Sequence, residues 1–138
     1  MSSMIGEKAP NFNLKTSEGD DFKFNELEGS WKVLFFYAKA GSPTCKRGCL
    51  TFKQQYDLFR SLEPPVEIIG ISEDSVKQHR EFKSELDLPF TLLSDPDRSV
   101  AEMYNVPVHL GTFPAKSSFV IGPDNTIHPV SYTHLRAH

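Results

Sequence analysis

Residues 33–49 read VLFFYAKAGSPTCKRGC, a short apolar run followed by a loop and a cysteine-containing segment. The apolar run, residues 33–37, has the length and aromatic content of a strand that is buried on both faces. Ser42 is a good N-cap, and Pro43 suits the first position of a helix. The stretch therefore predicts a buried strand that leads into a helix, with Cys45 in the first helical turn.

An apolar stripe extends this predicted helix toward the C-terminus. Pro64 and Pro65 end the helix, because proline lacks the N–H that a helix interior requires. The residues of the stripe recur at steps of three and four, which is typical of one buried helical face. They are Cys45, Cys49, Phe52, Tyr56, Phe59 and Leu62.

Strands and helices alternate along the rest of the chain, which is typical of an α/β domain. Apolar and polar residues alternate near residues 12–14 and 22–24, on either side of Gly19-Asp20, and predict an N-terminal hairpin. We expect further strands at residues 66–71, 90–93 and 118–121 and from Thr126, and further helices at residues 75–86 and 99–104.

The length and composition indicate one globular domain. The 138 residues are enough to bury a core, and the net charge of −3 gives no reason to expect a nucleic-acid surface. No apolar run approaches the roughly 20 residues that span a bilayer. The N-terminus lacks the layout of a secretory signal, so we expect a cytoplasmic protein. We place the domain at residues 1–128 and interpret residues 129–138, PVSYTHLRAH, as a disordered or non-native tail where a C-terminal helix is missing.

Cys45 is the candidate nucleophile. Two cysteines are too few to stabilise a domain of this size through disulfides. Their presence therefore favours a role in catalysis or redox sensing. The thiolate is the reactive form, and an ordinary thiol of pKa 8.5 is only about 3% ionised at pH 7. Ionising most of it needs roughly 3.4 kcal/mol, whereas a helix N-terminus contributes about 0.3–2 kcal/mol. A hydroxyl such as that of Ser42 and a cation from elsewhere in the fold must supply the rest.

Cys49 lies four residues after Cys45 and shares its helical face. The two Cα atoms are then about 6 Å apart, which a disulfide tolerates after some unwinding of the helix. Cys49 could therefore condense with a sulfenic acid formed at Cys45. The alternative is that both cysteines are small apolar residues of the core, which the stripe also allows.

Other kinds of site have weaker support in the sequence. Two cysteines at this spacing are at most half of a zinc site. Three residues separate the cysteines, so there is no CxxC motif, and no glycine-rich phosphate loop occurs. We interpret Asp95 and Asp97 as turn and cap residues. No metal or cofactor is expected.

Several segments, taken in order, resemble those of the peroxiredoxins, in the subgroup called peroxiredoxin Q or bacterioferritin-comigratory protein. The resemblance covers nearly all of residues 4–128. It implies a thioredoxin fold with an N-terminal β-hairpin extension. The segments that carry it are KAPNF at 8–12, the run at 33–37, CKRGCLTF at 45–52, IGIS at 69–72, LLSDPD at 92–97 and AKSSFVI at 115–121.

The resemblance implies a thiol-dependent peroxidase that reduces hydrogen peroxide and organic hydroperoxides with electrons from a thioredoxin-like donor. Cys45 matches the peroxidatic cysteine, Ser42 matches the hydroxyl residue three positions before it, and Lys116 stands where the family has an arginine. Cys49 is the expected resolving cysteine, although the family commonly has that residue one position later, where this chain has Leu50. Neither a nucleic acid nor a membrane is an expected partner, and we expect a monomer or a weak dimer.

Two departures from the family pattern keep other functions open. Ala38 replaces a proline that shields the site, and Lys116 keeps the charge of an arginine but loses its fixed fork of donors. The main alternative is a non-catalytic redox-sensing or binding domain on the same fold. A thiol–disulfide oxidoreductase is a third hypothesis, against which the spacing of the cysteines argues.

Overall fold

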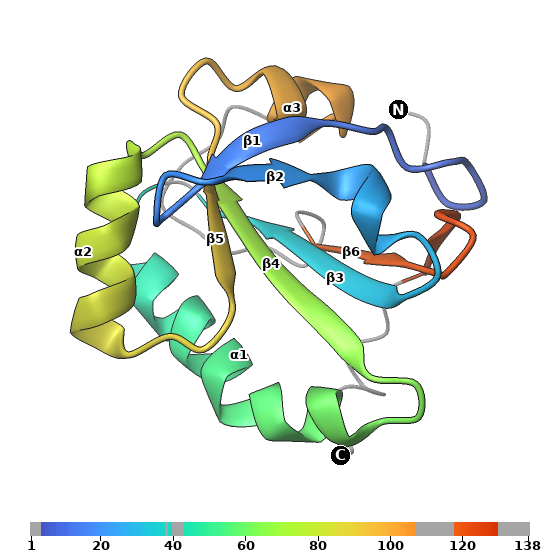
Figure 1. Cartoon of the computed structure of the whole chain (residues 1–138), viewed down its shortest axis with the longest axis horizontal. Coiled ribbons are helices and arrows are strands. Elements are labelled where there is room, and N and C mark those ends of the chain that lie inside the picture. Colours follow the sequence, from blue (N-terminus) through green and yellow to red (C-terminus); the bar gives the residue numbers. More distant parts are fainter. Residues whose placement is uncertain (1–3, 38, 40–42, 107–117, 130–138) are drawn as a thin grey trace.

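The computed structural model describes residues 4–37, 39, 43–106 and 118–129. Within them the chain forms a seven-stranded sheet in the order β2-β1-β5-β4-β3-β6-β7 (Figure 1). The elements are β1 (Asn13–Thr16), β2 (Asp21–Lys23), the 3-10 helix η1 (Phe24–Leu27), β3 (Trp31–Phe36), α1 (Pro43–Ser61), β4 (Val66–Ser72), α2 (Val76–Leu86), β5 (Thr91–Ser94), α3 (Ser99–Met103), β6 (Ser118–Ile121) and β7 (Ile127–His128).

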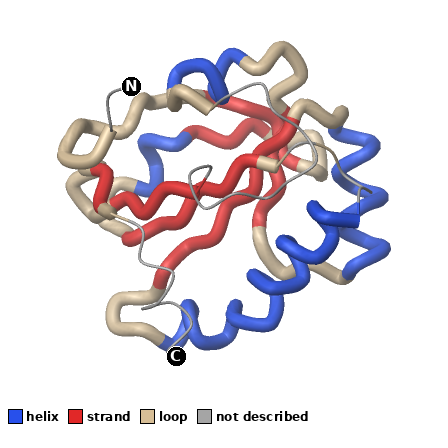
Figure 2. Tube along the Cα trace, turned by 180° about the vertical axis from the view of Figure 1, so that it is seen from behind, coloured by secondary structure: helices blue, strands red, loops and turns tan. Residues whose placement is uncertain are grey.

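The three central strands are parallel and the strands outside them are antiparallel. β3 pairs with β4 and β4 pairs with β5 in parallel, whereas β1 runs against β5 and β6 runs against β3. The connecting helices α1 and α2 lie together on one side of the sheet, away from α3 (Figures 1 and 2). Parallel strands need such crossover helices, and this arrangement covers the centre of the sheet on both faces.

Successive side chains of β3 enter two different cores. Leu34 and Phe36 join the cluster on the side of the N-terminal hairpin and α3, while Val33 and Phe35 join the cluster beneath α1 and α2. Side chains alternate between the faces of a strand, so a strand covered on both faces is apolar throughout. This explains why residues 33–37 form one continuous apolar run.

Gly70 sets how closely α1 approaches the sheet. A Cβ atom at Gly70 would lie 2.6 Å from Cζ of Phe35 on the adjacent strand, so only glycine leaves room for that ring. The Phe35 ring in turn stacks on Phe52 of α1, with ring centroids 4.5 Å apart and an interplanar angle of 13°. The missing side chain of β4 thereby allows the cysteine-bearing helix to pack against β3.

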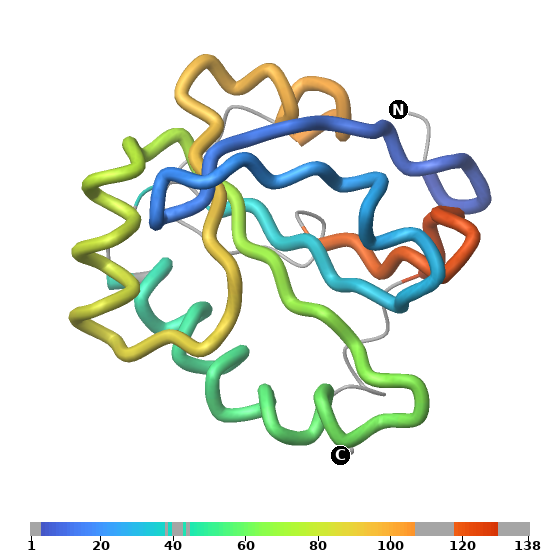
Figure 3. Tube along the Cα trace, in the orientation of Figure 1, coloured from blue at the N-terminus to red at the C-terminus, as the bar shows by residue number. Residues whose placement is uncertain are grey.

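The N-terminal residues lie beside the turn between β6 and β7 (Figure 3). The N–H of Gly6 donates to the carbonyl of Ile127 at 2.8 Å. Lys32 is fully buried nearby, and its ammonium donates to the carbonyls of Ser30 at 3.0 Å and Gly122 at 3.3 Å. The Gly6 bond thus attaches the N-terminal residues to β7, and the Lys32 bonds attach β3 to the turn that follows β6.

Most of the predicted elements form where they were expected. The run at 33–37 lies in β3 and the following residue Tyr37, the helix predicted from Pro43 is α1, and the helix predicted at 75–86 is α2. Ser75 caps α2 through a capping box with Gln78, the N–H of which donates to the Ser75 hydroxyl at 3.1 Å.

Two expectations about single residues are wrong. Phe24 begins the 3-10 helix η1 and does not extend the second strand of the hairpin. Leu62 is 43% exposed because α1 ends at Ser61, so the last step of the apolar stripe falls outside the helix. Within the described residues, no helix is both long and apolar enough to cross a membrane. The proposed tail, apart from Pro129, lies outside the described residues, and so does any C-terminal helix.

Candidate active site

Cys45 lies in the first turn of α1, two residues after the helix begins at Pro43. Its side chain is 0% exposed, as is that of Cys49 one turn further along. Both cysteines are reduced thiols. The first turn of a helix has backbone N–H groups without helical partners, and its dipole favours negative charge. Cys45 therefore lies at the end of α1 that favours negative charge.

Both cysteines belong to the hydrophobic cluster between α1, α2 and the sheet, which we call the α1 core. The interpretation of the stripe as a buried helical face is thus confirmed for these two residues. Any chemistry at the sulfur atoms takes place in largely apolar surroundings. The buried members of the α1 core are Val33, Phe35, Tyr37, Cys45, Cys49, Phe59, Ile68, Phe82, Leu88, Phe90 and Leu92.

The surroundings of Cys49 oppose the ionisation of its thiol. Burial raises the pKa of Cys49 to about 12, and negative charge at Cys45 adds to the effect. A buried anion loses its hydration, and a second anion nearby repels it. At neutral pH Cys49 is therefore a thiol, which is the less nucleophilic form of the sulfur.

A buried polar cluster lies at the carboxyl end of β4. The Ser72 hydroxyl donates to the Asp74 carboxylate at 2.7 Å and accepts from the Asp74 N–H at 3.2 Å. The Nε2 atom of His79, on α2, is 2.8 Å from the same hydroxyl oxygen. His79 is 0% exposed, and burial lowers its pKa to about 4. The imidazole is consequently neutral at physiological pH.

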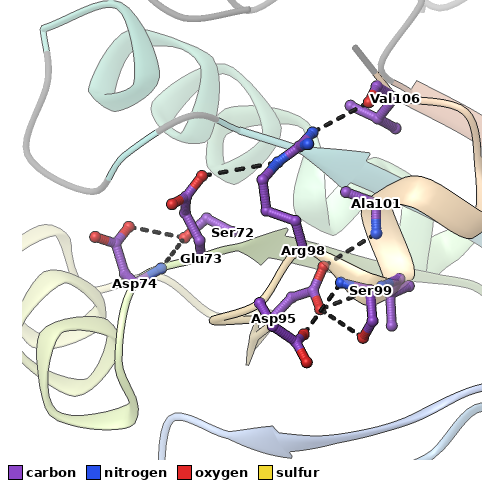
Figure 4. A network of polar contacts seen from close by, with 10 residues as sticks. Ser72, Glu73, Asp74, Asp95, Arg98, Ser99, Ala101 and Val106 are labelled. Atoms are coloured by element: carbon purple, nitrogen blue, oxygen red, sulfur yellow. Dashed lines mark hydrogen bonds and ion pairs between the residues drawn. The ribbon is translucent and has the colours of Figure 1, made fainter. Parts of the chain in front are cut away.

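A second polar network joins the end of β5 to α3 (Figure 4). The Asp95 carboxylate accepts from the N–H groups of Val100 at 3.2 Å and Ala101 at 3.0 Å. Arg98 donates to the carbonyl of Val106 at 3.1 Å and lies 3.7 Å from the Glu73 carboxylate. The interpretation of Asp95 as a cap residue is confirmed. The network holds Val106, after which the segment carrying Lys116 follows in the sequence.

The structure brings together two of the four predicted site residues. Cys45 and Cys49 lie on one face of α1, as their spacing predicts. Ser42, Lys116 and Ala38 lie outside the described residues. Lys46 does not supply the cation near the sulfur, because its ammonium pairs with Glu85 of α2 at 3.0 Å on the surface.

Sequence reasoning missed the polar groups of Tyr37, which is buried in the α1 core with the cysteines, and of His79, which is buried against the Tyr37 ring. Tyr37 is read as the last apolar residue of a strand, and its hydroxyl is overlooked. His79 stands three residues from Val76 and from Phe82, which is the spacing of the apolar face of α2. A histidine on the apolar face of a predicted helix indicates a buried imidazole, so the sequence contained this signal. The described residues contain no group of three or more potential ligands that could hold a metal ion.

The family model described as the AhpC/TSA family matches residues 5–130, and the chain belongs to that family. A putative peroxiredoxin bcp from Coxiella burnetii is 39% identical over 94% of this chain and 89% of its own length. A cysteine-to-serine mutant of PrxQ from Xylella fastidiosa has a TM-score of 0.81 at 25% identity, over 99% of this chain and 94% of the other. The bacterioferritin comigratory protein of Xanthomonas campestris has a TM-score of 0.75 at 25% identity, over 91% and 86%.

These relatives confirm the resemblance to peroxiredoxin Q and its implied fold and activity. The sheet and helices match those of thioredoxin-fold peroxiredoxins. The chain is a thiol-dependent peroxidase, and the relatives do not favour a non-catalytic domain or a disulfide oxidoreductase.

Proposed function

We propose that Cys45 is the peroxidatic cysteine and Cys49 the resolving cysteine of this peroxidase. The observation that carries the proposal is their arrangement: two buried, reduced thiols one turn apart at the start of a helix that follows a central strand. The Cys45 thiolate attacks the terminal peroxide oxygen, and the O–O bond breaks. Cys45 becomes a sulfenic acid, and the leaving oxygen takes up the proton released by the thiol.

The charge that develops in this step needs hydrogen-bond donors and a cation. The N–H groups of the first turn of α1 supply part of the stabilisation. We assign the remainder to the Ser42 hydroxyl and the Lys116 ammonium. In support, Ser118 at the start of β6 pairs with Phe35 of β3, so β6 begins beside the strand that leads to α1. Lys116 precedes Ser118 by two residues in the sequence.

Disulfide formation follows when the Cys49 sulfur attacks the sulfenic acid. The S–S bond forms, the S–O bond of Cys45 breaks, and water leaves with the Cys49 proton. A sulfenic acid is neutral, so the negative charge of Cys45 no longer raises the pKa of Cys49. Oxidation of the first cysteine thus makes the second easier to ionise, which gives the two steps their order.

An external dithiol then reduces the disulfide. The Xanthomonas protein described above is associated with alkyl peroxide reduction. A structurally similar 1-Cys peroxiredoxin of yeast mitochondria is resolved through glutathione and thioredoxin systems. We accordingly propose hydrogen peroxide and organic hydroperoxides as substrates and a thioredoxin-like protein as the electron donor. We also propose a cytoplasmic monomer or weak dimer, which light scattering of the purified chain tests.

Peroxide consumption coupled to a thioredoxin system tests the assignment of the cysteines. Cys45→Ser should abolish consumption, and full activity in this variant would overturn the assignment of Cys45. Cys49→Ser should still form one sulfenic acid per chain, detected by trapping with dimedone, but should stall turnover. An unchanged steady-state rate in Cys49→Ser would show that Cys49 does not resolve the sulfenic acid.

A further inference from the structure

The hydrogen bonds of Ser72 determine which nitrogen of His79 carries the proton. A serine hydroxyl has one hydrogen to donate, and Ser72 donates it to the Asp74 carboxylate at 2.7 Å. The contact of 2.8 Å between the Ser72 oxygen and Nε2 of His79 therefore requires a proton on Nε2. Since the imidazole is neutral, its Nδ1 atom has a free lone pair. That atom is buried and has no hydrogen-bond partner among the described residues.

The Tyr37 hydroxyl is the second buried polar group in this region without a hydrogen-bond partner among the described residues. A weak hydrogen-bonding interaction with the Ser72 hydroxyl lowers the pKa of Tyr37, but this contact lacks the geometry of a full hydrogen bond, and the hydrogen and both lone pairs of Ser72 are engaged by Asp74 and His79. The Tyr37 ring meets the His79 ring edge to face, with centroids 5.9 Å apart and an interplanar angle of 79°. The two rings therefore contact each other, although neither of these two polar atoms has a hydrogen-bond partner within the described residues.

Buried polar groups without partners are rare in folded proteins, and each costs the fold its lost hydration. Tyr37 is 5% exposed and belongs to the α1 core together with Cys45 and Cys49. Charge at Cys49 affects the Tyr37 hydroxyl more strongly than charge at Cys45 does. A donor with no partner among the residues that the structure describes thus lies in the same apolar cluster as the buried Cys49 thiol, which must ionise in the resolving step.

We propose that the Tyr37 hydroxyl is a further catalytic group of the resolving step, donating a hydrogen bond to the Cys49 sulfur as this thiol loses its proton. His79 acts as a positioning residue through its contact with the Tyr37 ring. The inference rests on the proposed role of Cys49. The reaction consumes one thiol and one sulfenic acid and yields one disulfide and one water. Tyr37 keeps its own proton, so no additional reactant is needed.

The electrostatics of the cluster agree with this role. Burial raises the pKa of Tyr37 well above its ordinary value, and charge at Cys49 raises it further, so the phenol remains a donor at every physiological pH. The other titratable groups that act on the cluster are Cys45 of α1, Asp74 after β4 and His79 of α2. A hydrogen bond to an anionic acceptor is about twice as strong as one to a neutral acceptor. The donor therefore favours the Cys49 thiolate over the thiol.

The test is the variant Tyr37→Phe, which removes the hydroxyl and keeps the ring, in the full chain. Tyr56→Phe is the matched control, because Tyr56 packs against the same α1 core from α1 itself. Rapid mixing with hydrogen peroxide, followed by trapping with dimedone and mass spectrometry, separates the formation of the sulfenic acid from the formation of the disulfide. In Tyr37→Phe we expect unchanged formation of the sulfenic acid and about tenfold slower formation of the disulfide.

The pH profile separates a chemical role from a structural one. Loss of a donor to the Cys49 thiolate should shift the rise of the resolving rate about one pH unit higher, since tenfold in rate corresponds to one unit. Tyr56→Phe should leave the rates and the profile unchanged. Equal resolving rates in Tyr37→Phe and the wild type would overturn the role of Tyr37 and leave that of Cys49 intact.

Two further outcomes also overturn the inference. If the wild type forms no disulfide after oxidation by peroxide, the proposed role of Cys49 fails and the role of Tyr37 fails with it. If Tyr37→Phe slows both steps by the same factor without shifting the pH profile, Tyr37 supports only the packing of α1. Circular dichroism of each variant confirms that the fold is retained before the rates are compared.

Discussion

Tyr37 and Tyr104 are two buried tyrosines with opposite hydrogen-bonding states. The Tyr104 hydroxyl donates to the carbonyl of Pro10 at 2.7 Å, and burial raises the Tyr104 pKa. The Tyr37 hydroxyl has no partner among the described residues. An unmade hydrogen bond in a core costs stability, whereas a satisfied one contributes to it. The hydroxyl of Tyr104 therefore stabilises the fold, whereas burial of the Tyr37 hydroxyl destabilises it.

We predict that Tyr37→Phe stabilises the protein by about 1–3 kcal/mol, because it removes a buried hydroxyl that no described residue satisfies. Tyr104→Phe should destabilise it by about 1 kcal/mol, because it leaves the Pro10 carbonyl without its donor. Unfolding in urea with reduced protein measures both values. A Tyr37→Phe variant that is less stable than the wild type would mean that the hydroxyl has a partner in solution.

His79 predicts an acid-sensitive component of stability. Its pKa falls from 6.5 to about 4 in the fold, so the folded protein binds a proton less readily than the unfolded chain. The contribution of neutral His79 to the free energy of unfolding is fully present above pH 6.5 and is lost as the pH falls toward 4. The difference of about 2.5 units corresponds to roughly 3 kcal/mol at most.

The free energy of unfolding should therefore decrease from pH 6.5 to 4 in the wild type and decrease less in His79→Phe, which retains an aromatic ring but cannot be protonated. Urea denaturation at several pH values measures both slopes. Parallel slopes for the two proteins would show that His79 does not gain a proton on unfolding in this range.

At the scale of elements, the sequence predicts the strands and helices because each has a period. β3 is a run of apolar residues, α1 has Cys45, Cys49 and Phe52 at helical spacing, and both are found as expected. The ends are less predictable: the stripe alone does not show that α1 stops before Leu62. Nor does any local pattern show that Gly70 lies against the Phe35 ring, because that contact depends on the pairing of two strands.

Gly70→Ala should destabilise the protein, because the new methyl group would lie 2.6 Å from Cζ of Phe35 and 2.9 Å from Cδ2 of Leu92. Overpacking of this kind costs about 1–3 kcal/mol. Phe35→Leu removes the closest ring atoms, so the double variant should lose less stability than the sum of the single variants. Strict additivity in urea denaturation would show that the strands move apart to accommodate the methyl group.

At the scale of the whole molecule, sheet order brings distant parts of the sequence to one end of α1. β3 lies between β4 and β6, so Tyr37 directly follows a strand that has a parallel neighbour on one side and an antiparallel neighbour on the other. His79 arrives from α2, which begins shortly after β4 ends. The hydrogen-bonding state of Tyr37 and His79 results from this convergence and cannot be read from either segment alone. The motif around Cys45 is local, so the sequence predicts it.

The role proposed for Lys116 depends on the same convergence. Lys116→Met should slow the formation of the sulfenic acid at Cys45 by about ten- to a hundredfold, because it removes a cation that offsets the developing negative charge. Lys116→Arg should retain the rate or raise it, since a guanidinium offers a fixed fork of donors.

Lys15→Met is the control: Lys15 pairs with Asp21 at 2.6 Å on the exposed hairpin, and its loss should leave the rate unchanged. Rapid mixing with hydrogen peroxide measures all three variants. A wild-type rate in Lys116→Met would show that this ammonium does not act on the Cys45 sulfur, and the cation would then have to be sought on another element.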